Sequence, residues 1–343
     1  MIEKHLMEQF ERLRPNEEHE QKIFRQIIEK STIESRRSFS WRHLRPAMLV
    51  AAVMIFVLTT TAYAGSYLGL DVKWLGFLNP SNNEQGLYLD HGAYVVNKQT
   101  ANNNGIVEVK QIIGDSHLIY ILMDFTAPEG IALNAQRYRF ETSLSQRTPG
   151  SSSSSYGYTL LEDDNPNDNK ISLVMSCLQK DNKLMGQDVI LTVSNLEEAD
   201  VYPDQYETLI PGSWTVQFKM DYTNMSTTYP VNKAVSLYGY EGSLSSLSIS
   251  PIAITIKVTS AHVKEISAAA SQSFREIGPN EYSDHYPVTI KYKDGTSETT
   301  AVFNGMSIGD LLDDTITVVK TFTPIINNKK IESIVFFDEE IDL

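Results

Sequence analysis

The sequence PAMLVAAVMIFVLTTTAYAGSYLGL, residues 46–70, decides how the rest of the chain is arranged, because it contains no charged residue. A helix rises about 1.5 Å per residue, so about 20 apolar residues cross the hydrocarbon core of a bilayer, and this stretch predicts a transmembrane helix. Only Lys73 follows it closely, whereas four arginines lie just before it: Arg36, Arg37, Arg42 and Arg45. Because arginines are retained on the cytosolic side, we predict that residues 1–45 are cytosolic and residues 71–343 extracellular.

A cleaved signal peptide is the alternative interpretation of this stretch. The triplet Ala62-Tyr63-Ala64 follows an apolar core, as a signal-peptidase site does. The leader of 45 residues, however, is far longer than the short basic region of a signal peptide, and its pattern predicts folded structure. We therefore favour a retained membrane anchor.

The charge of the chain is strongly uneven across this stretch. Residues 46–343 hold 19 Lys and Arg against 35 Asp and Glu, a net charge of −16. Such a region repels anionic polymers, so the sequence argues against binding to nucleic acid. The single cysteine, Cys177, lies in an apolar context and is predicted to be a buried small hydrophobe. A large extracellular region without an internal disulfide is typical of a bacterial, particularly a Gram-positive, surface.

The cytosolic segment 1–45 predicts two short helices that expose an apolar stripe. The first helix stops before Pro15, and Asn16 caps the second. Two such helices cannot bury this stripe against each other, so it needs a partner. A protein groove fits better than a membrane surface, because the second helix is rich in glutamate; a functionless helical leader is the alternative. The candidate partner-binding residues are Phe10, Leu13, Ile23, Phe24, Ile27 and Ile28.

After the predicted anchor, residues 71–85 resemble a short stalk, with Trp74 placed near the outer membrane interface. From Gly86 onward the pattern is β, with no long helical period. The turn signals predict two tandem antiparallel β-sandwich domains of immunoglobulin-like type, over residues 86–229 and 230–343. Strands are expected over 105–113, 117–125, 137–144, 156–161, 171–179, 187–193, 213–222, 234–240, 252–259, 288–293, 298–303, 315–322 and 331–337. Asp294-Gly295 gives the clearest hairpin signal.

No arrangement of residues predicts chemistry. The seven histidines are scattered without the spacing of metal ligands, and neither a nucleophile elbow nor a phosphate-binding glycine loop is present. We therefore expect no enzyme activity, no cofactor and no metal site.

Several segments together resemble a known family. They are LMEQFERLRPNEEHEQKIFRQIIEK (6–30), RRSFSWRHLRP (36–46), NNNGIVEVKQIIGDSHLIYILMDFTAPEG (102–130), SLSSLSISPIAITIKV (243–258), YPVTIKYKDGTSE (286–298) and KKIESIVFFDEEIDL (329–343). The chain resembles Gram-positive single-pass membrane proteins with the ectodomain called domain of unknown function 4179, which are described as anti-sigma-factor-like. The resemblance implies that the cytosolic segment binds an extracytoplasmic-function sigma factor, and it supplies no catalytic residues.

Two classes of function follow as hypotheses. In the first, the chain is a membrane regulator that couples an extracellular β sensor for an unknown ligand to a cytosolic sigma-factor-binding segment. In the second, it is a cell-surface binding or adhesion protein, or an envelope-assembly protein, with an inert cytosolic leader.

Overall fold

The computed structural model describes residues 70–343, apart from gaps at 147–153, 163–164, 166, 181–182, 201–204, 278–286, 302–305, 311–312 and 337–338. The predicted cytosolic segment 1–45 and residues 46–69 of the predicted anchor lie outside the described residues. Within the described part of the chain, no helix has both the length and the apolar character needed to cross a bilayer.

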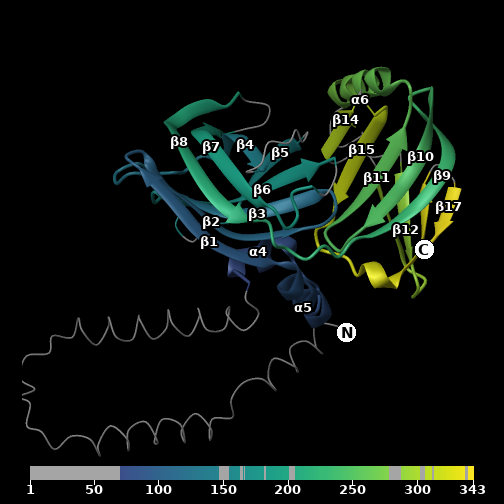
Figure 1. Ribbon diagram of the computed structural model, residues 1–343, viewed down its shortest axis with the longest axis horizontal. Helices are drawn as coiled ribbons and strands as arrows, with labels where there is room; N and C mark the ends of the chain where they lie inside the picture. The colour runs from purple at the N-terminus through teal and green to yellow at the C-terminus, as the bar shows by residue number, and fades with distance from the viewer. Residues whose placement is uncertain are drawn as a thin grey trace, which may run out of the picture. The chain divides into compact units, whose positions relative to one another are not determined.

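The first half of the described chain forms two antiparallel sheets (Figure 1). The larger sheet has the order β1-β2-β3-β6-β5, and the smaller has the order β4-β7-β8. The strands are β1 (Tyr94–Asn102), β2 (Gly105–Gly114), β3 (Leu118–Thr126), β4 (Arg137–Gln146), β5 (Ser154–Leu160), β6 (Lys170–Gln179), β7 (Asp188–Ala199) and β8 (Glu207–Lys219).

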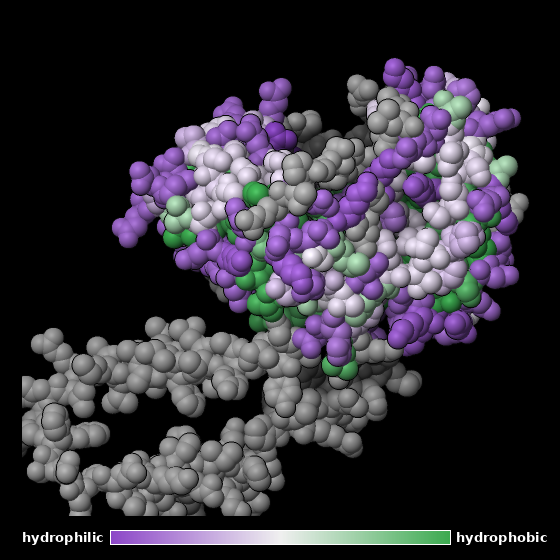
Figure 2. Space-filling view, viewed as in Figure 1, coloured by the Kyte–Doolittle hydropathy of each residue, from purple (hydrophilic) through white to green (hydrophobic). Residues whose placement is uncertain are grey.

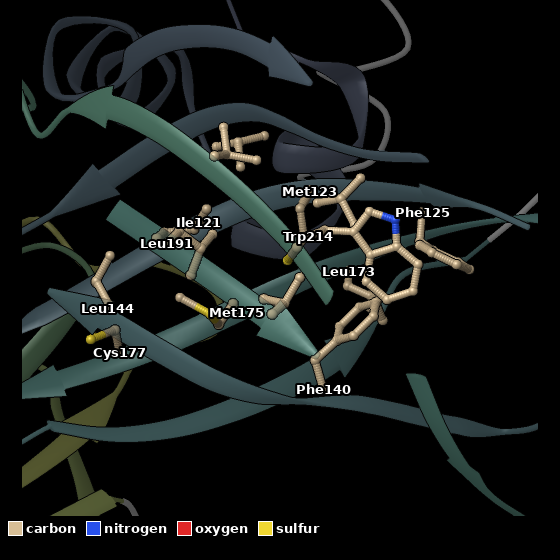
Figure 3. Packing of buried hydrophobic residues seen from close by; sticks show 14 of the residues in the cluster. Ile121, Met123, Phe125, Phe140, Leu144, Leu173, Met175, Cys177, Leu191 and Trp214 are labelled. Atoms are coloured by element: carbon tan, nitrogen blue, oxygen red, sulfur yellow. The ribbon is translucent and has the colours of Figure 1, made fainter. Parts of the chain in front are cut away.

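Alternating apolar residues of these two sheets enclose one core, in which three aromatic rings pack edge to face (Figure 3). The ring centroids of Phe125 and Trp214 are 5.3 Å apart, and those of Phe125 and Phe140 are 5.6 Å apart. The Trp214 indole N–H donates to the Gly105 carbonyl at 3.0 Å. Cys177 is fully buried in the same core, as the sequence predicts, and burial raises the pKa of its thiol to about 11.

The second half forms another pair of antiparallel sheets around a separate core. The orders are β14-β15-β11-β10-β9 and β13-β12-β16-β17. The strands are β9 (Thr227–Leu237), β10 (Tyr240–Ile249), β11 (Ala253–Thr259), β12 (Pro287–Tyr292), β13 (Ser297–Ala301), β14 (Met306–Asp310), β15 (Thr315–Thr321), β16 (Ile331–Phe336) and β17 (Glu339–Asp342). We call the two pairs of sheets the first and the second sandwich.

The mainly β, antiparallel and sandwich-like architecture predicted from the sequence is confirmed. The Asp294-Gly295 hairpin is also confirmed: Gly295 has φ +82°, and its N–H donates to the Tyr292 carbonyl at 2.9 Å. The prediction omitted strands β1, β10, β14 and β17.

The helices differ from the prediction. Residues 71–85 contain α4 (Val72–Leu78) and the start of α5 (Asn83–Gly92), so they are folded rather than a stalk. The absence of a long helix after Gly86 was also wrong, because α6 (Val263–Ile277) follows β11. Val263 and Ile266 anchor α6 in the core of the second sandwich, and three consecutive alanines favour the helix. A short 3-10 helix, η3 (Asn328–Lys330), precedes β16.

Gly105 is required by both its backbone and its surroundings. Its φ is +138°, and an added Cβ would lie 2.6 Å from the Thr126 carbonyl oxygen and 2.8 Å from the Phe125 ring. We expect Gly105→Ala to lower the free energy of unfolding by about 1–3 kcal/mol, the usual cost of such a strained conformation.

The matched control is Gly157→Ala in β5, where no atom lies within 4 Å of the added Cβ and φ is ordinary. Denaturant unfolding of the two variants measures the difference. Equal free energies of unfolding for Gly105→Ala and Gly157→Ala would show that the atoms around Gly105 move away from the added Cβ without a loss of stability.

Candidate functional site

The six residues predicted to bind a cytosolic partner lie outside the described residues: Phe10, Leu13, Ile23, Phe24, Ile27 and Ile28. The candidate site available in the structure is therefore the place where the chain that follows the predicted anchor meets the two sandwiches.

Local sequence forms the two helices at this place. The Asp71 side chain caps α4 by accepting from the Lys73 N–H at 2.9 Å, and Asn79 ends the helix in a left-handed conformation. The Asn82 side chain caps α5 by accepting from the Gln85 N–H at 3.0 Å. Both helices are short, so their stability depends on tertiary packing.

Helix α4 packs into a core that both sandwiches share. Leu70, Trp74 and Leu78 are buried against the face of β3 that points away from the core of the first sandwich. The Trp74 and Tyr120 ring centroids are 6.4 Å apart. We call this cluster the junction core: Leu70, Trp74, Leu78, Leu89, Ile113, Leu118, Tyr120, Leu122, Leu161, Val174, Leu178, Ile252, Ala253, Val319 and Ile325.

Trp74 therefore does not lie at a membrane interface, as the sequence suggested, but is fully buried in protein. Its aromatic ring gains more contact area in the junction core than it would in the headgroup region. Among the described residues, its indole N–H has no hydrogen-bond partner.

Ionic contacts hold the start of α4 to the same sheet. Asp71 pairs with Lys110, and its backbone N–H donates to the Gln111 side chain at 2.9 Å. Lys110 also lies 3.8 Å from the Asp124 carboxylate. The first turn of α4 is thus connected to strands β2 and β3.

Asp124 is buried beneath α4. Burial alone would raise the pKa of its carboxyl, but hydrogen bonds from Lys170 and Ser172, with the charges of Lys110 and Lys170, hold the pKa below its ordinary value. Lys170 lies 2.8 Å from one carboxylate oxygen, and the Ser172 hydroxyl donates to the other at 2.5 Å. Lys73 of α4 donates to the same hydroxyl at 2.7 Å, so the helix joins this network.

A loop of the second sandwich holds both helices from the other side. The Ile325 N–H donates to the Leu78 carbonyl at 3.2 Å, and the Gln85 side chain donates to the Ile325 carbonyl at 2.8 Å. The loop is fixed to the β10–β11 turn, because the Ile326 N–H donates to the Pro251 carbonyl at 3.0 Å. The helices therefore bond to both sandwiches.

Asp115 connects the two sandwiches directly. It lies in the β2–β3 turn, and one carboxylate oxygen accepts from the His117 and Leu118 N–H groups, each at 2.8 Å. The other oxygen accepts from the Ser250 hydroxyl, in the β10–β11 turn, at 2.6 Å. The Tyr222 hydroxyl donates to the Asp115 carbonyl at 3.1 Å.

Burial raises the pKa of the Asp115 carboxyl, even though the hydrogen bonds from Ser250, His117 and Leu118 and the proximity of the His117 side chain lower it. Three tyrosines surround this carboxylate: Tyr88 of α5, Tyr120 of β3, and Tyr222. Burial raises the pKa of each hydroxyl, and the negative charge of Asp115 raises it further.

The arrangement is suited to holding parts of the chain together. In the described ranges, no group of three or more His, Cys, Asp and Glu residues could bind a metal ion. A sequence signal for the junction existed: residues 118–123 of β3 are apolar at every position, and such a strand is buried on both faces. No signal identified Ser250 as the partner of Asp115.

Comparisons with known proteins add little. No protein-family model matches the chain, and no curated protein matches it. Among solved structures, the chain is similar to the crystal structure of a conserved domain protein from Bacillus anthracis, with 17% sequence identity and a TM-score of 0.46. The match covers 78% of this chain and 83% of the other. A likeness this distant supports no argument about function.

Trp74 tests how strongly α4 is held. We expect Trp74→Ala to lower the free energy of unfolding by about 3–5 kcal/mol, as large truncations in a packed core do. Trp74→Phe keeps much of the aromatic side chain and removes an indole N–H that has no partner among the described residues, so its cost should be about 1 kcal/mol or less.

Val72→Ala is the matched control in α4, because Val72 is 63% exposed and the change should stay within about 0.5 kcal/mol. Denaturant unfolding followed by circular dichroism measures all three variants. A small effect of Trp74→Ala would contradict a junction core that depends on α4.

Asp115 tests the connection between the sandwiches through pH. A carboxyl with a raised pKa contributes stability that is present below the ordinary value of about 3.9 and is lost as pH rises through the raised value. Asp115→Asn removes this titration and keeps an oxygen that accepts from the two backbone N–H groups. We therefore expect the free energy of unfolding of the natural protein minus that of Asp115→Asn to be larger at pH 4.5 than at pH 7.5.

The measurement is denaturant unfolding of both proteins across this range. Asp188→Asn, at the exposed start of β7, is the control that removes one negative charge outside the junction core. Parallel pH curves for the natural protein and Asp115→Asn would contradict a raised pKa at Asp115.

Proposed function

We propose that this chain is a single-pass membrane regulator of the anti-sigma-factor type. In this proposal residues 1–45 lie in the cytosol and bind an extracytoplasmic-function sigma factor, and the stretch over residues 46–70 anchors the chain in the cell membrane. The β regions 86–229 and 230–343, with an immunoglobulin-like arrangement in each, lie outside the cell and sense an envelope condition or ligand.

The observation that carries this proposal is the packing of α4 directly after the predicted anchor. Leu70, Trp74 and Leu78 belong to the junction core shared by both sandwiches. A protein that only displays a binding domain needs a spacer of sufficient length and no fixed contact between spacer and domain. Here a rearrangement of the sandwiches acts directly on the residue that follows the anchor, as a sensor requires.

Composition supports the cytosolic half of the proposal. Residues 1–45 carry an apolar stripe without enough sequence to bury it, which suits a protein groove as the partner. The net charge of −16 on residues 46–343 argues against nucleic acid as an extracellular ligand.

A reporter of sigma-dependent transcription tests the coupling. We expect Phe24→Ala to weaken recovery of the sigma factor with the full-length protein about thirtyfold, because truncating a central aromatic in an interface costs about 2 kcal/mol. Reporter activity should rise accordingly. Trp74→Ala, which weakens the packing of α4 without touching residues 1–45, should change the reporter response to envelope stress, whereas Val72→Ala should not.

The two kinds of variant separate the two classes of function. If the full-length protein recovers no sigma factor and deletion of residues 1–45 leaves transcription unchanged, the regulator proposal fails. A surface-binding protein would instead keep its function when residues 1–45 are exchanged for an unrelated leader.

A further inference from the structure

The structure leaves no spacer between the predicted anchor and the folded β region. Leu70 is buried in the junction core, and α4 begins at Val72. A helix of 24 residues, the number in the stretch 46–69, would span about 36 Å, little more than the roughly 30 Å hydrocarbon core. If they cross the membrane, Leu70 lies at the level of the lipid headgroups, and the surface around α4 and α5 meets the bilayer.

The exposed side of α5 borders an apolar hollow of about 240 Å³. Leu87, Tyr88 and His91 line it from the helix, and Met225 and Lys329 line it from the second half of the chain. Leu87 is 50% exposed, so its side chain is available to a partner at this hollow. Where Figure 1 draws α5, Figure 2 shows a small hydrophobic patch bordered by hydrophilic residues.

The charge of this hollow differs from that of the whole β region. Among the residues whose side chains the structure describes, no Asp or Glu lines it, although residues 46–343 carry a net charge of −16. Lys329 lies at its edge, and the Lys293 ammonium donates to the Lys329 carbonyl at 3.3 Å, so a second lysine is close. Asp90, three residues after Leu87, is half-buried and does not line the hollow.

Leucine and lysine together suit a membrane interface. The leucine enters the acyl boundary, and the lysine extends to lipid phosphate. We propose that Leu87, Tyr88, His91, Met225 and Lys329 form a docking surface for anionic phospholipid of the outer leaflet, which holds the β region directly on the membrane. This proposal rests on the membrane anchor of the proposed function.

A spin label at Leu87 tests the docking surface in the full-length chain. The protein is placed in nanodiscs of phosphatidylcholine with one-quarter phosphatidylglycerol, and the Leu87→Cys variant is labelled with a nitroxide. Cys177 is fully buried and its thiol pKa is raised to about 11, so it does not compete for the label.

Ile106→Cys is the matched control. Ile106 is 38% exposed at the start of β2, whereas α5 contacts β2 near its end, where Gly92 approaches Ile113. Ile106 and Ile113 are seven positions apart, which is about 23 Å along the strand, so the control label lies well away from the docking surface.

We expect the ratio of oxygen to nickel-complex accessibility to be several-fold higher for the label at Leu87 than for the label at Ile106. Lys329→Glu on the Leu87→Cys background should lower the ratio toward that of the control, because it places a negative charge opposite anionic lipid. Release of the chain from membranes by alkaline carbonate would overturn the anchor, and the docking surface with it. A firmly inserted chain whose Leu87 label is as hydrated as the Ile106 label would overturn the docking surface alone.

Discussion

The structure depends on a sheet that is apolar on both faces. Along β3, Ile119, Ile121 and Met123 point into the core of the first sandwich, whereas Leu118, Tyr120 and Leu122 point the other way. A strand of this kind cannot leave either face in water, because each exposed leucine or isoleucine would forgo about 1.5–3 kcal/mol of burial. Helix α4 and the second sandwich cover the outer face, and the junction core follows from this requirement.

Two buried carboxylates give this apolar junction its specific alignment. Asp124 lies among lysines, so its pKa is held below the ordinary value and its charge is stabilised in place. The Asp115 carboxylate accepts hydrogen bonds mainly from one hydroxyl and two backbone N–H groups. Burial outweighs their effect and raises its pKa. Apolar surfaces can slide against each other at small cost in free energy. A buried carboxylate that loses its hydrogen-bond donors costs much more. Asp115 and Ser250 therefore fix how the two turns meet.

Sequence reasoning recovers what is local and periodic. Most strands alternate clearly, and Asp294-Gly295 specifies its hairpin through the positive φ that glycine allows. Helix α4 is different: its seven residues show no helical period long enough to detect, and it exists because Trp74 and Leu78 find a partner in the folded protein.

Ambiguity of side-chain chemistry accounts for the remaining errors. Trp74 follows an apolar stretch, and a tryptophan in that position suits a lipid interface and a protein core equally well until the tertiary structure is known. Ser250 lies 135 residues after Asp115, so no spacing in the sequence connects them. The candidate site was missed for this reason: it is assembled from segments that lie far apart in the sequence, none of which carries a motif.

If the chain is the regulator proposed above, the strength of the junction limits how a signal can pass through it. Truncating the Trp74 side chain alone should lower the free energy of unfolding by about 3–5 kcal/mol. Leu70, Leu78 and the Asp71–Lys110 pair also hold α4 in place. Coupling between two sites in a protein is typically about 1–3 kcal/mol, so in the proposed regulator the binding of an extracellular ligand would not supply enough free energy to detach the helix. Under the proposed function, a signal that arises in the sandwiches would therefore either move α4 together with the junction core as one body, or act by cutting the chain before Leu70. The first route needs a second packing of the junction that differs little in free energy from the observed one. The second route needs no alternative packing, which makes it the simpler consequence of so firm an attachment.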